Sequence, residues 1–268
     1  MTGFTEETKA GGMEVLSRPT LALGRVLGIP LYLNYSWFPV FFLLTLVLAN
    51  VYYPANFKYW TVIQYWAVAA VSAILLFASV VFHELGHAVL ATRSGITVRS
   101  ITLFFFGGAA RIGSAPQSAR AEFLIAAAGP VASLALATAF LLLHPLAAGV
   151  PTLAGLVRYV AVVNIGLVVF NLIPGFPLDG GRILRALVWA LTNDHKRATI
   201  LSARAGQFFG AICFAAGGWR IFQGHFNGFW IVALGWFLAS SASAQISRAL
   251  ATKGPVEQPE RIEVPAAA

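Results

Sequence analysis

The sequence has little charge. Asp, Glu, Lys and Arg make up only 10% of its 268 residues, whereas hydrophobic residues make up 58%. A soluble globular domain carries about 25% charged residues. The shortage excludes an ordinary water-soluble domain and indicates that lipid surrounds most of the chain. We therefore expect an all-α polytopic membrane protein.

Cysteine and acidic residues are also scarce. Cys213 is the only cysteine, which excludes an intramolecular disulfide and a thiolate metal cluster. Between residues 15 and 256 the only carboxylates are Glu84, Glu122, Asp179 and Asp194. Ionisable groups at membrane depth are costly and usually functional, so these four are the first candidates for chemistry.

Long apolar runs are abundant. Six of them approach or exceed the roughly 20 residues that a helix needs to cross a bilayer, at 31–51, 61–92, 121–143, 156–173, 200–222 and 226–249. With a cytosolic N-terminus, fifteen Lys and Arg residues fall on the inside and three on the outside. This bias predicts that both termini are cytosolic. Because the basic residues flank the apolar runs, the net charge of +8 does not predict nucleic-acid binding.

These runs predict three regions: a cytosolic lead-in at 1–30, a six-span membrane domain at 31–250 and a disordered C-terminal tail at 251–268.

Two connectors between the predicted spans are unusual. Residues 96–112 are rich in β-formers and predict a hairpin turned at Gly107–Gly108, with an amphipathic interfacial loop as the alternative. Residues 171–182 contain two prolines, which predict that the fourth span unwinds before a short helix at 181–192.

The run His-Glu-Leu-Gly-His at 83–87 lies within the second apolar stretch. A His-x-x-x-His spacing places two imidazoles one turn apart on one helix face, where His83 and His87 can bind one metal ion. Glu84 points about 100° away, which suits a general base that does not bind the metal. The alternative is that these histidines only donate hydrogen bonds to neighbours or line a proton path.

Two histidines leave a catalytic zinc one protein ligand short. Asp179 is the candidate, because it follows the unwound segment; its alternative role is to cap the next helix. Asp194 fits better as part of a solvated pair beside His195 and Lys196. Glu122 fits as a helix-start carboxylate or as an interfacial pair with the neighbouring Arg120. Asn171 could donate to a reaction oxyanion, or satisfy carbonyls that the prolines free.

These motifs resemble the site-2 protease family of intramembrane metalloproteases. The similarity rests on FHELGH at 82–87, NLIPGFPLDGGR at 171–182 and AAAGPVAS at 126–133, and extends over about residues 20–250. The opening GIPLYLNYSWF and the six spans look like the compact bacterial and archaeal branch. Many members of that branch carry a cytosolic CBS pair after the last span, which we expect this chain to lack.

The resemblance implies a Zn²⁺ bound by His83, His87 and Asp179, with Glu84 as general base and acid and Asn171 in the family's asparagine position. It also implies a membrane-embedded β-hairpin between the second and third spans that binds unwound substrate, here through Phe105, Phe106, Gly107 and Gly108. The expected function is zinc-dependent hydrolysis of a peptide bond in a transmembrane substrate, such as a membrane-anchored regulator, in a bacterial or archaeal cell membrane.

Two other functions remain open. A membrane metal transporter could use the same histidines, although it would place ionisable residues along several spans. A catalytically silent homologue could bind transmembrane segments without cutting them, although the intact Glu84 argues against this. The sequence gives no indication of the oligomeric state.

Overall fold

The chain is mostly helical. The computed structural model describes residues 20–104 and 107–251, which form two compact units that divide after Leu172. Among the described residues, six helical segments are long and apolar enough to cross a membrane, which agrees with the predicted six spans: Trp37–Asn56, Val62–Arg93, Ala119–Ala147, Pro151–Asn171, His195–Phe222 and Gly228–Ala251. Residues 1–19 of the predicted lead-in and 252–268 of the predicted tail lie outside the described residues.

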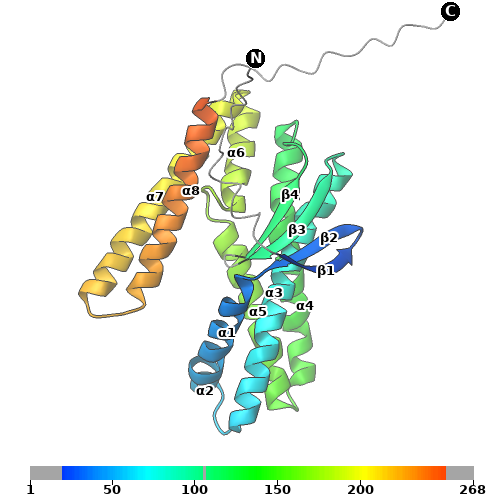
Figure 1. Ribbon diagram of the computed structural model, residues 1–268, viewed down its shortest axis with the longest axis vertical. Helices are drawn as coiled ribbons and strands as arrows, with labels where there is room; N and C mark the ends of the chain where they lie inside the picture. The colour runs from blue at the N-terminus through cyan, green and yellow to red at the C-terminus, as the bar shows by residue number, and fades with distance from the viewer. Residues whose placement is uncertain (1–19, 105–106, 252–268) are drawn as a thin grey trace, which may run out of the picture. The chain divides into compact units, whose positions relative to one another are not determined.

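The helices of the first unit surround one long central helix (Figure 1). The first span consists of α1 (Trp37–Val47), the π-helical η2 (Leu48–Tyr52) and α2 (Tyr53–Asn56). The central helix α3 (Val62–Arg93) packs against α1 and against α4 (Ala119–Ala147) and α5 (Pro151–Asn171). Polar bonds join these helices inside the apolar unit, because burial without a partner is costly.

Two such bonds involve serines of α3. The Tyr53 hydroxyl lies 2.6 Å from Ser72 Oγ, and Asn164 Nδ2 of α5 donates to Ser79 Oγ over 2.9 Å. At the N-terminus of α3, Thr61 and Gln64 form a reciprocal capping box. The 32 residues of α3 span about 48 Å at 1.5 Å per residue, more than the roughly 30 Å hydrocarbon core. The helix therefore tilts or extends beyond the core.

The first unit also contains a four-stranded sheet, of which the sequence predicted only half. Its strands are β1 (Thr20–Val26), β2 (Ile29–Asn34), β3 (Val98–Phe104) and β4 (Gly107–Ile112), in the order β1-β2-β3-β4. The outer pairs are antiparallel and the central pair is parallel. The first span was predicted to begin at residue 31, but its helix begins at Trp37, because the preceding alternating segment forms β2.

The hairpin predicted at 96–112 exists as β3 and β4, but its predicted turn was wrong. Phe104 pairs with Gly107 and Leu103 with Gly108, so the two glycines open the second strand. The connection between the strands is residues 105–106, outside the described residues. Glycine at the start of β4 lets this strand lie close to α3, as described below.

One face of the sheet packs on α3. Ile101 of β3 is fully buried and clusters with Ile29 of β2 and Ala88 of α3. Because side chains alternate along a strand, residues 100 and 102 project from the opposite face. The sheet thus has one apolar face fixed to the helix that carries the histidines.

The second unit begins with an irregular segment and continues with α6 (Asp179–Thr192), α7 (His195–Phe222) and α8 (Gly228–Ala251). The helix α5 ends at Asn171, as the prolines predicted. The segment is held to α7 by a bond from Phe176 N to Ser202 O over 3.2 Å. Phe176 is buried and lies under the guanidinium of Arg185, 4.9 Å from ring centre to Cζ.

The helices α7 and α8 lie side by side as a hairpin (Figure 1). Glycines at the same spacing on each helix allow this approach. A Cβ on Gly210 would lie 2.9 Å from Gly235 O, and one on Gly217 would lie 2.8 Å from Gly228 O. Small residues that let backbones approach are the usual means of helix association in membranes.

Candidate metal centre

The two histidines of the HELGH run face each other on α3. Both side chains are buried, with 5% of His83 and 4% of His87 exposed. Their Nε2 atoms lie 3.2 Å apart. The predicted one-turn spacing therefore brings one nitrogen from each ring to a common point.

The other nitrogen of each ring contacts α4. His83 Nδ1 lies 2.9 Å from Ser133 Oγ, and His87 Nδ1 lies 2.6 Å from the carbonyl oxygen of Ile125. A carbonyl can only accept, so His87 carries its proton on Nδ1 and has a lone pair on Nε2. Partners of this kind fix the tautomer and the orientation of metal-binding histidines.

The face of α4 that contacts the histidines is built at four-residue intervals, by Ile125, Gly129 and Ser133. A Cβ on Gly129 would lie 2.6 Å from His83 Nε2 and closer still to His87 Nε2. On α3, a Cβ on Gly86 would lie 2.6 Å from the carbonyl oxygen of Ala128. Glycines on both helices thus make the room in which the imidazoles lie.

The donor set fits a zinc ion. Two nitrogens that bind one zinc at about 2.0–2.1 Å in tetrahedral geometry lie about 3.3 Å apart, and the two Nε2 atoms lie 3.2 Å apart. Imidazole is a common zinc ligand, and both ring orientations are fixed from the far nitrogen.

Glu84 lies beside the edge of the sheet. A Cβ on Gly108 would lie 2.6 Å from Glu84 Cγ and 3.4 Å from its Oε1, so the strand β4 passes directly over this side chain. Within the described residues β4 has a strand partner on one side only, because it ends the order β1-β2-β3-β4. The predicted base therefore lies next to a free strand edge.

Asp179 belongs to the second unit, where it is buried and is the first residue of α6. The N-cap position is Leu178, whose side chain forms no cap bond, so Asp179 does not occupy the predicted cap position. One carboxylate oxygen of Asp179 lies 3.9 Å from Nη1 of Arg182. The ligand role of Asp179 stays a prediction.

The other two carboxylates, Asp194 and Glu122, lie at the starts of helices. Asp194 caps α7, where it accepts a bond from Arg197 N over 2.9 Å and pairs with the Arg197 side chain over 3.0 Å. Glu122 lies in the first turn of α4, as predicted, and its side chain is fully buried.

Asn171 is the last residue of α5. Its Nδ2 donates to the carbonyl oxygen of Leu167 over 3.0 Å. Pro174 and Pro177 leave the carbonyls of residues 170 and 173 without their usual donors, so this bond does not serve the role predicted from the prolines. An amide has two N–H groups, and the bond uses one.

Of the predicted substrate-binding residues, Gly107 and Gly108 begin β4, whereas Phe105 and Phe106 lie outside the described residues.

Comparison with known protein families identifies the family of this chain. The model of the peptidase family M50 matches residues 71–152 and 148–213, which include the two histidines and Asp179. The chain belongs to the M50 family, the site-2 protease family.

Relatives of this M50 family member are named as zinc metalloproteases. A Synechocystis protein named "Putative zinc metalloprotease sll0528" is 37% identical over 233 residues, 85% of this chain. A Mycobacterium tuberculosis protein named "Putative zinc metalloprotease Rip3" is 38% identical over 235 residues, 86% of this chain. The chain spans about 60% of the length of each of these curated relatives.

A solved structure, the site-2 protease from Methanocaldococcus jannaschii, is also similar. It matches this M50 family member with a TM-score of 0.55 and 28% identity, over 85% of this chain and 95% of that one. The similarity supports the multi-pass membrane fold.

The sequence reasoning missed the parts of the centre that α4 and β4 contribute. The run AAAGPVAS at 126–133 was used only as a motif of the family resemblance. Its Gly129 and Ser133 lie one turn apart, like the two histidines of α3. Matching four-residue spacings on two apolar helices were the available signal. The contact between Gly108 and Glu84 left no signal, because it depends on where the sheet packs.

Proposed function

We propose that this chain is a zinc-dependent intramembrane protease, which hydrolyses a peptide bond in or near the transmembrane segment of a membrane-protein substrate during regulated proteolysis. The observation that carries the proposal is the pair of Nε2 atoms 3.2 Å apart, with Glu84 beside a free strand edge. A transporter would have no use for a base beside a strand edge that could pair with a peptide.

His83, His87 and Asp179 would hold the zinc ion. Among the four carboxylates of the membrane domain, Asp194 already caps a helix and Glu122 is buried in the first turn of another. Zinc, when bound, polarises a carbonyl group and lowers the pKa of water. A carboxylate is a usual third protein ligand in catalytic zinc sites.

Glu84 acts as the general base. It takes a proton from the attacking water, which then adds to the scissile carbonyl carbon. Glu84 next delivers that proton to the amine nitrogen as the carbon–nitrogen bond breaks, so it ends the cycle as a carboxylate. The second N–H of the Asn171 amide would donate to the oxyanion that forms when water adds.

The substrate is an unwound transmembrane segment that pairs with β4. A helical peptide bond is shielded by its own hydrogen bonds, so the segment must extend before it is cut. An edge strand binds extended peptide through its backbone, and this mode needs no particular side chain on the enzyme. Because Gly108 lies against Glu84, such pairing would bring the substrate backbone to the base. In this proposal the hairpin lies at membrane depth.

The charge bias supports cytosolic termini, and in this topology the C-terminal end of α3 would lie on the cytosolic side. His87 lies six residues before that end, about 9 Å along the helix axis. Water would therefore reach the site from the cytosol, and cleavage would release a cytosolic fragment.

The test is zinc analysis and a cleavage assay on the full chain, purified in detergent and reconstituted with single-span substrates. Glu84→Gln should keep its zinc and lose cleavage, because an amide cannot accept the proton. Asp179→Asn should lose zinc, because a neutral amide is a poor zinc ligand. Asp194→Asn is the matched control, since asparagine also caps helices well, and it should keep both zinc and activity.

Cleavage by Glu84→Gln would exclude Glu84 as the base. Unchanged zinc content in Asp179→Asn would remove Asp179 from the ligand set. Zinc binding without cleavage of any transmembrane substrate by the wild-type chain would favour a transporter or a silent homologue.

A further inference from the structure

An apolar groove lies between α3 and α4. Its volume is about 340 Å³, within the range of small-molecule sites, and every residue that lines it is apolar. Its floor is a close approach of the two helices, since a Cβ on Gly86 would lie 2.6 Å from the carbonyl oxygen of Ala128. The groove opens outward, because Phe82 and Val131 on its walls are 44% and 62% exposed.

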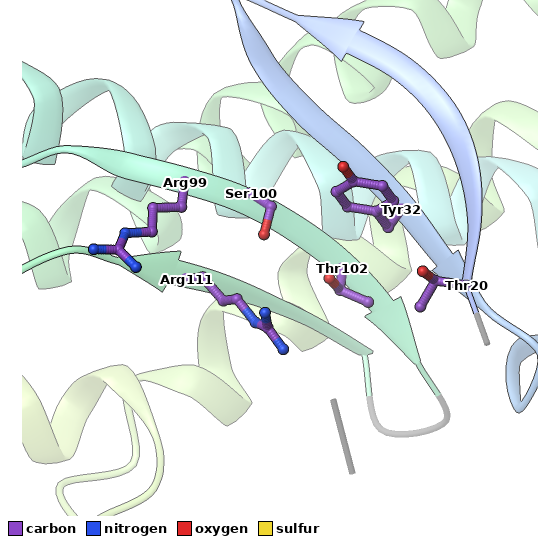
Figure 2. A pocket seen from close by; sticks show the side chains of 6 residues that line it. All are labelled: Thr20, Tyr32, Arg99, Ser100, Thr102 and Arg111. Carbon is purple, nitrogen blue, oxygen red and sulfur yellow. The ribbon is translucent and has the colours of Figure 1, made fainter. Parts of the chain in front are cut away.

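The groove differs from the hollow on the face of the sheet opposite α3. That hollow is lined by hydroxyl and guanidinium groups, such as those of Tyr32, Ser100 and Arg111 (Figure 2). In the groove no side chain can form a hydrogen bond, so a polar ligand would lose the bonds that it makes to water. The groove therefore fits hydrocarbon.

Leu27 also lines the groove, from the turn between β1 and β2. Leu27 and Gly28 both have positive φ, 52° and 80°, as the two central residues of a type I′ hairpin turn do. Asparagine or aspartate usually occupies the first of these positions, because a bulky side chain is strained there. The leucine is also 74% exposed. A strained and exposed leucine has a use if hydrocarbon fills the groove beside it.

Two arginines lie beyond one end of the groove. Arg93 is the last residue of α3 and Arg120 the second of α4, so both lie where the two spans are connected. Arg93 follows the groove residue Val89 by one turn, on the same face of α3. Arg120 precedes the groove residue Ala128 by two turns, at the edge of that face of α4. Both arginines are exposed, and neither forms an ion pair with a described residue.

The distance from the arginines into the groove matches one leaflet of a bilayer. Phe82 precedes Arg93 by eleven residues and Val131 follows Arg120 by eleven, which is about 16.5 Å along each helix axis. Half of the roughly 30 Å hydrocarbon core is about 15 Å. An acyl chain in the groove would therefore reach the bilayer centre when its phosphate lies beside the arginines.

We propose that this groove binds an acyl chain of an anionic phospholipid, whose phosphate is held by Arg93 and Arg120. The lipid belongs to the leaflet on the side where α3 ends and α4 begins. Guanidinium groups form charge-assisted hydrogen bonds with phosphate oxygens, and cationic side chains near a membrane surface attract anionic lipids. Phe82 and Leu85 of the groove flank Glu84 along α3, so the groove and the β3–β4 hairpin lie at the same depth. Lipid binding does not depend on proteolytic activity.

The experiment measures lipid binding by the full chain in a maltoside detergent. Dioleoyl phosphatidylglycerol is titrated into delipidated protein, and bound lipid is counted by native mass spectrometry. Dioleoyl phosphatidylcholine, which has the same acyl chains and no net charge, is the comparison lipid. The headgroup variants are Arg93→Gln, Arg120→Gln and the double variant. Their matched control is Arg204→Gln, which removes an exposed arginine of α7.

The acyl-chain variant is Ala135→Trp. Ala135 lines the groove, and a long side chain on a helix covers the turn before its own Cα, so the indole would fill the groove. Its matched control is Leu134→Trp, which adds the same ring at an exposed position of α4 outside the groove. A single gel-filtration peak and wild-type helix content by circular dichroism show that each variant is folded.

The wild-type chain should bind phosphatidylglycerol more tightly than phosphatidylcholine. Each single arginine substitution should weaken phosphatidylglycerol binding about fivefold, the contribution of one cationic side chain near a membrane surface. Ala135→Trp should leave both lipids unbound at concentrations that half-saturate the wild type, because the two lipids share their acyl chains. Both control variants should bind lipid like the wild type.

Undiminished phosphatidylglycerol binding by the double arginine variant would overturn the proposal, and so would undiminished binding by Ala135→Trp. Equal loss in Arg204→Gln would also overturn it, since that result would mean attraction by diffuse charge. The same spectra give the mass of the assembly. A lipid-free dimer that Ala135→Trp converts to a monomer would show that a second copy of the chain covers the groove instead of a lipid.

Discussion

The sharpest prediction concerns the glycine of α4 that lies against both imidazoles. In Gly129→Ala the new Cβ would lie 2.6 Å from His83 Nε2, whereas real Cβ atoms essentially never come closer than 3.0 Å. At least 3.0 − 2.6 = 0.4 Å of movement is therefore needed at His83, and more at His87. Metal–ligand distances tolerate about 0.2 Å, so the required movement exceeds what the site can absorb.

The rings cannot move away without loss, because their Nδ1 atoms are bound to Ser133 and to the Ile125 carbonyl. We expect zinc affinity to fall at least 10- to 100-fold, the range found when the supporting contacts of metal ligands are lost. The measurement is zinc per protein, by mass spectrometry after dialysis against a series of zinc buffers, together with cleavage activity.

The matched control is Gly166→Ala in α5, where an added Cβ would meet nothing within 4 Å. Alanine favours helix over glycine by about 0.5–1 kcal/mol, so neither substitution should disturb its helix intrinsically. Wild-type zinc affinity in Gly129→Ala would refute the arrangement of imidazoles against α4. Equal loss in the control would point to general damage instead.

Three further predictions follow from contacts in the first unit. Ser133→Ala removes a partner of the His83 imidazole, a proposed zinc ligand, and should weaken zinc binding about 10- to 100-fold in a metal titration. Thr138→Val, which deletes an exposed hydroxyl of the same helix, should not. Gly108→Ala should displace Glu84 and lower kcat while zinc content stays at the wild-type level; unchanged kcat would argue against the contact. Asn164→Ala removes a bond between two helices and should lower stability in detergent denaturation by about 0.6 kcal/mol, the mean for such bonds in membranes.

The sequence predicted the elements whose signal is local. Six apolar runs gave six helices, and the prolines after Asn171 ended α5 where expected. The two histidines faced each other because their spacing alone determines that geometry on a helix.

The sequence did not predict what depends on packing between distant segments. The alternating run of β2 was absorbed into the first span, because its large apolar residues also suit a membrane helix. The parallel pairing of β2 with β3 joins residues about 70 positions apart, and no local pattern encodes it. For the same reason Ser133, 50 residues from His83, was not recognised as its partner.

The close packing of α3 against α4 has a consequence for how the protein is assembled. Each imidazole is oriented by α4, so the two histidines are arranged to bind a metal only when α3 and α4 are fully packed against each other. A metal that binds only this seated pair stabilises it, by about 4 kcal/mol when its free concentration is 1,000 times the dissociation constant. Bound zinc would then stabilise the packing of α3 against α4. A chelator should therefore lower the thermal midpoint of the whole first unit as well as stop cleavage.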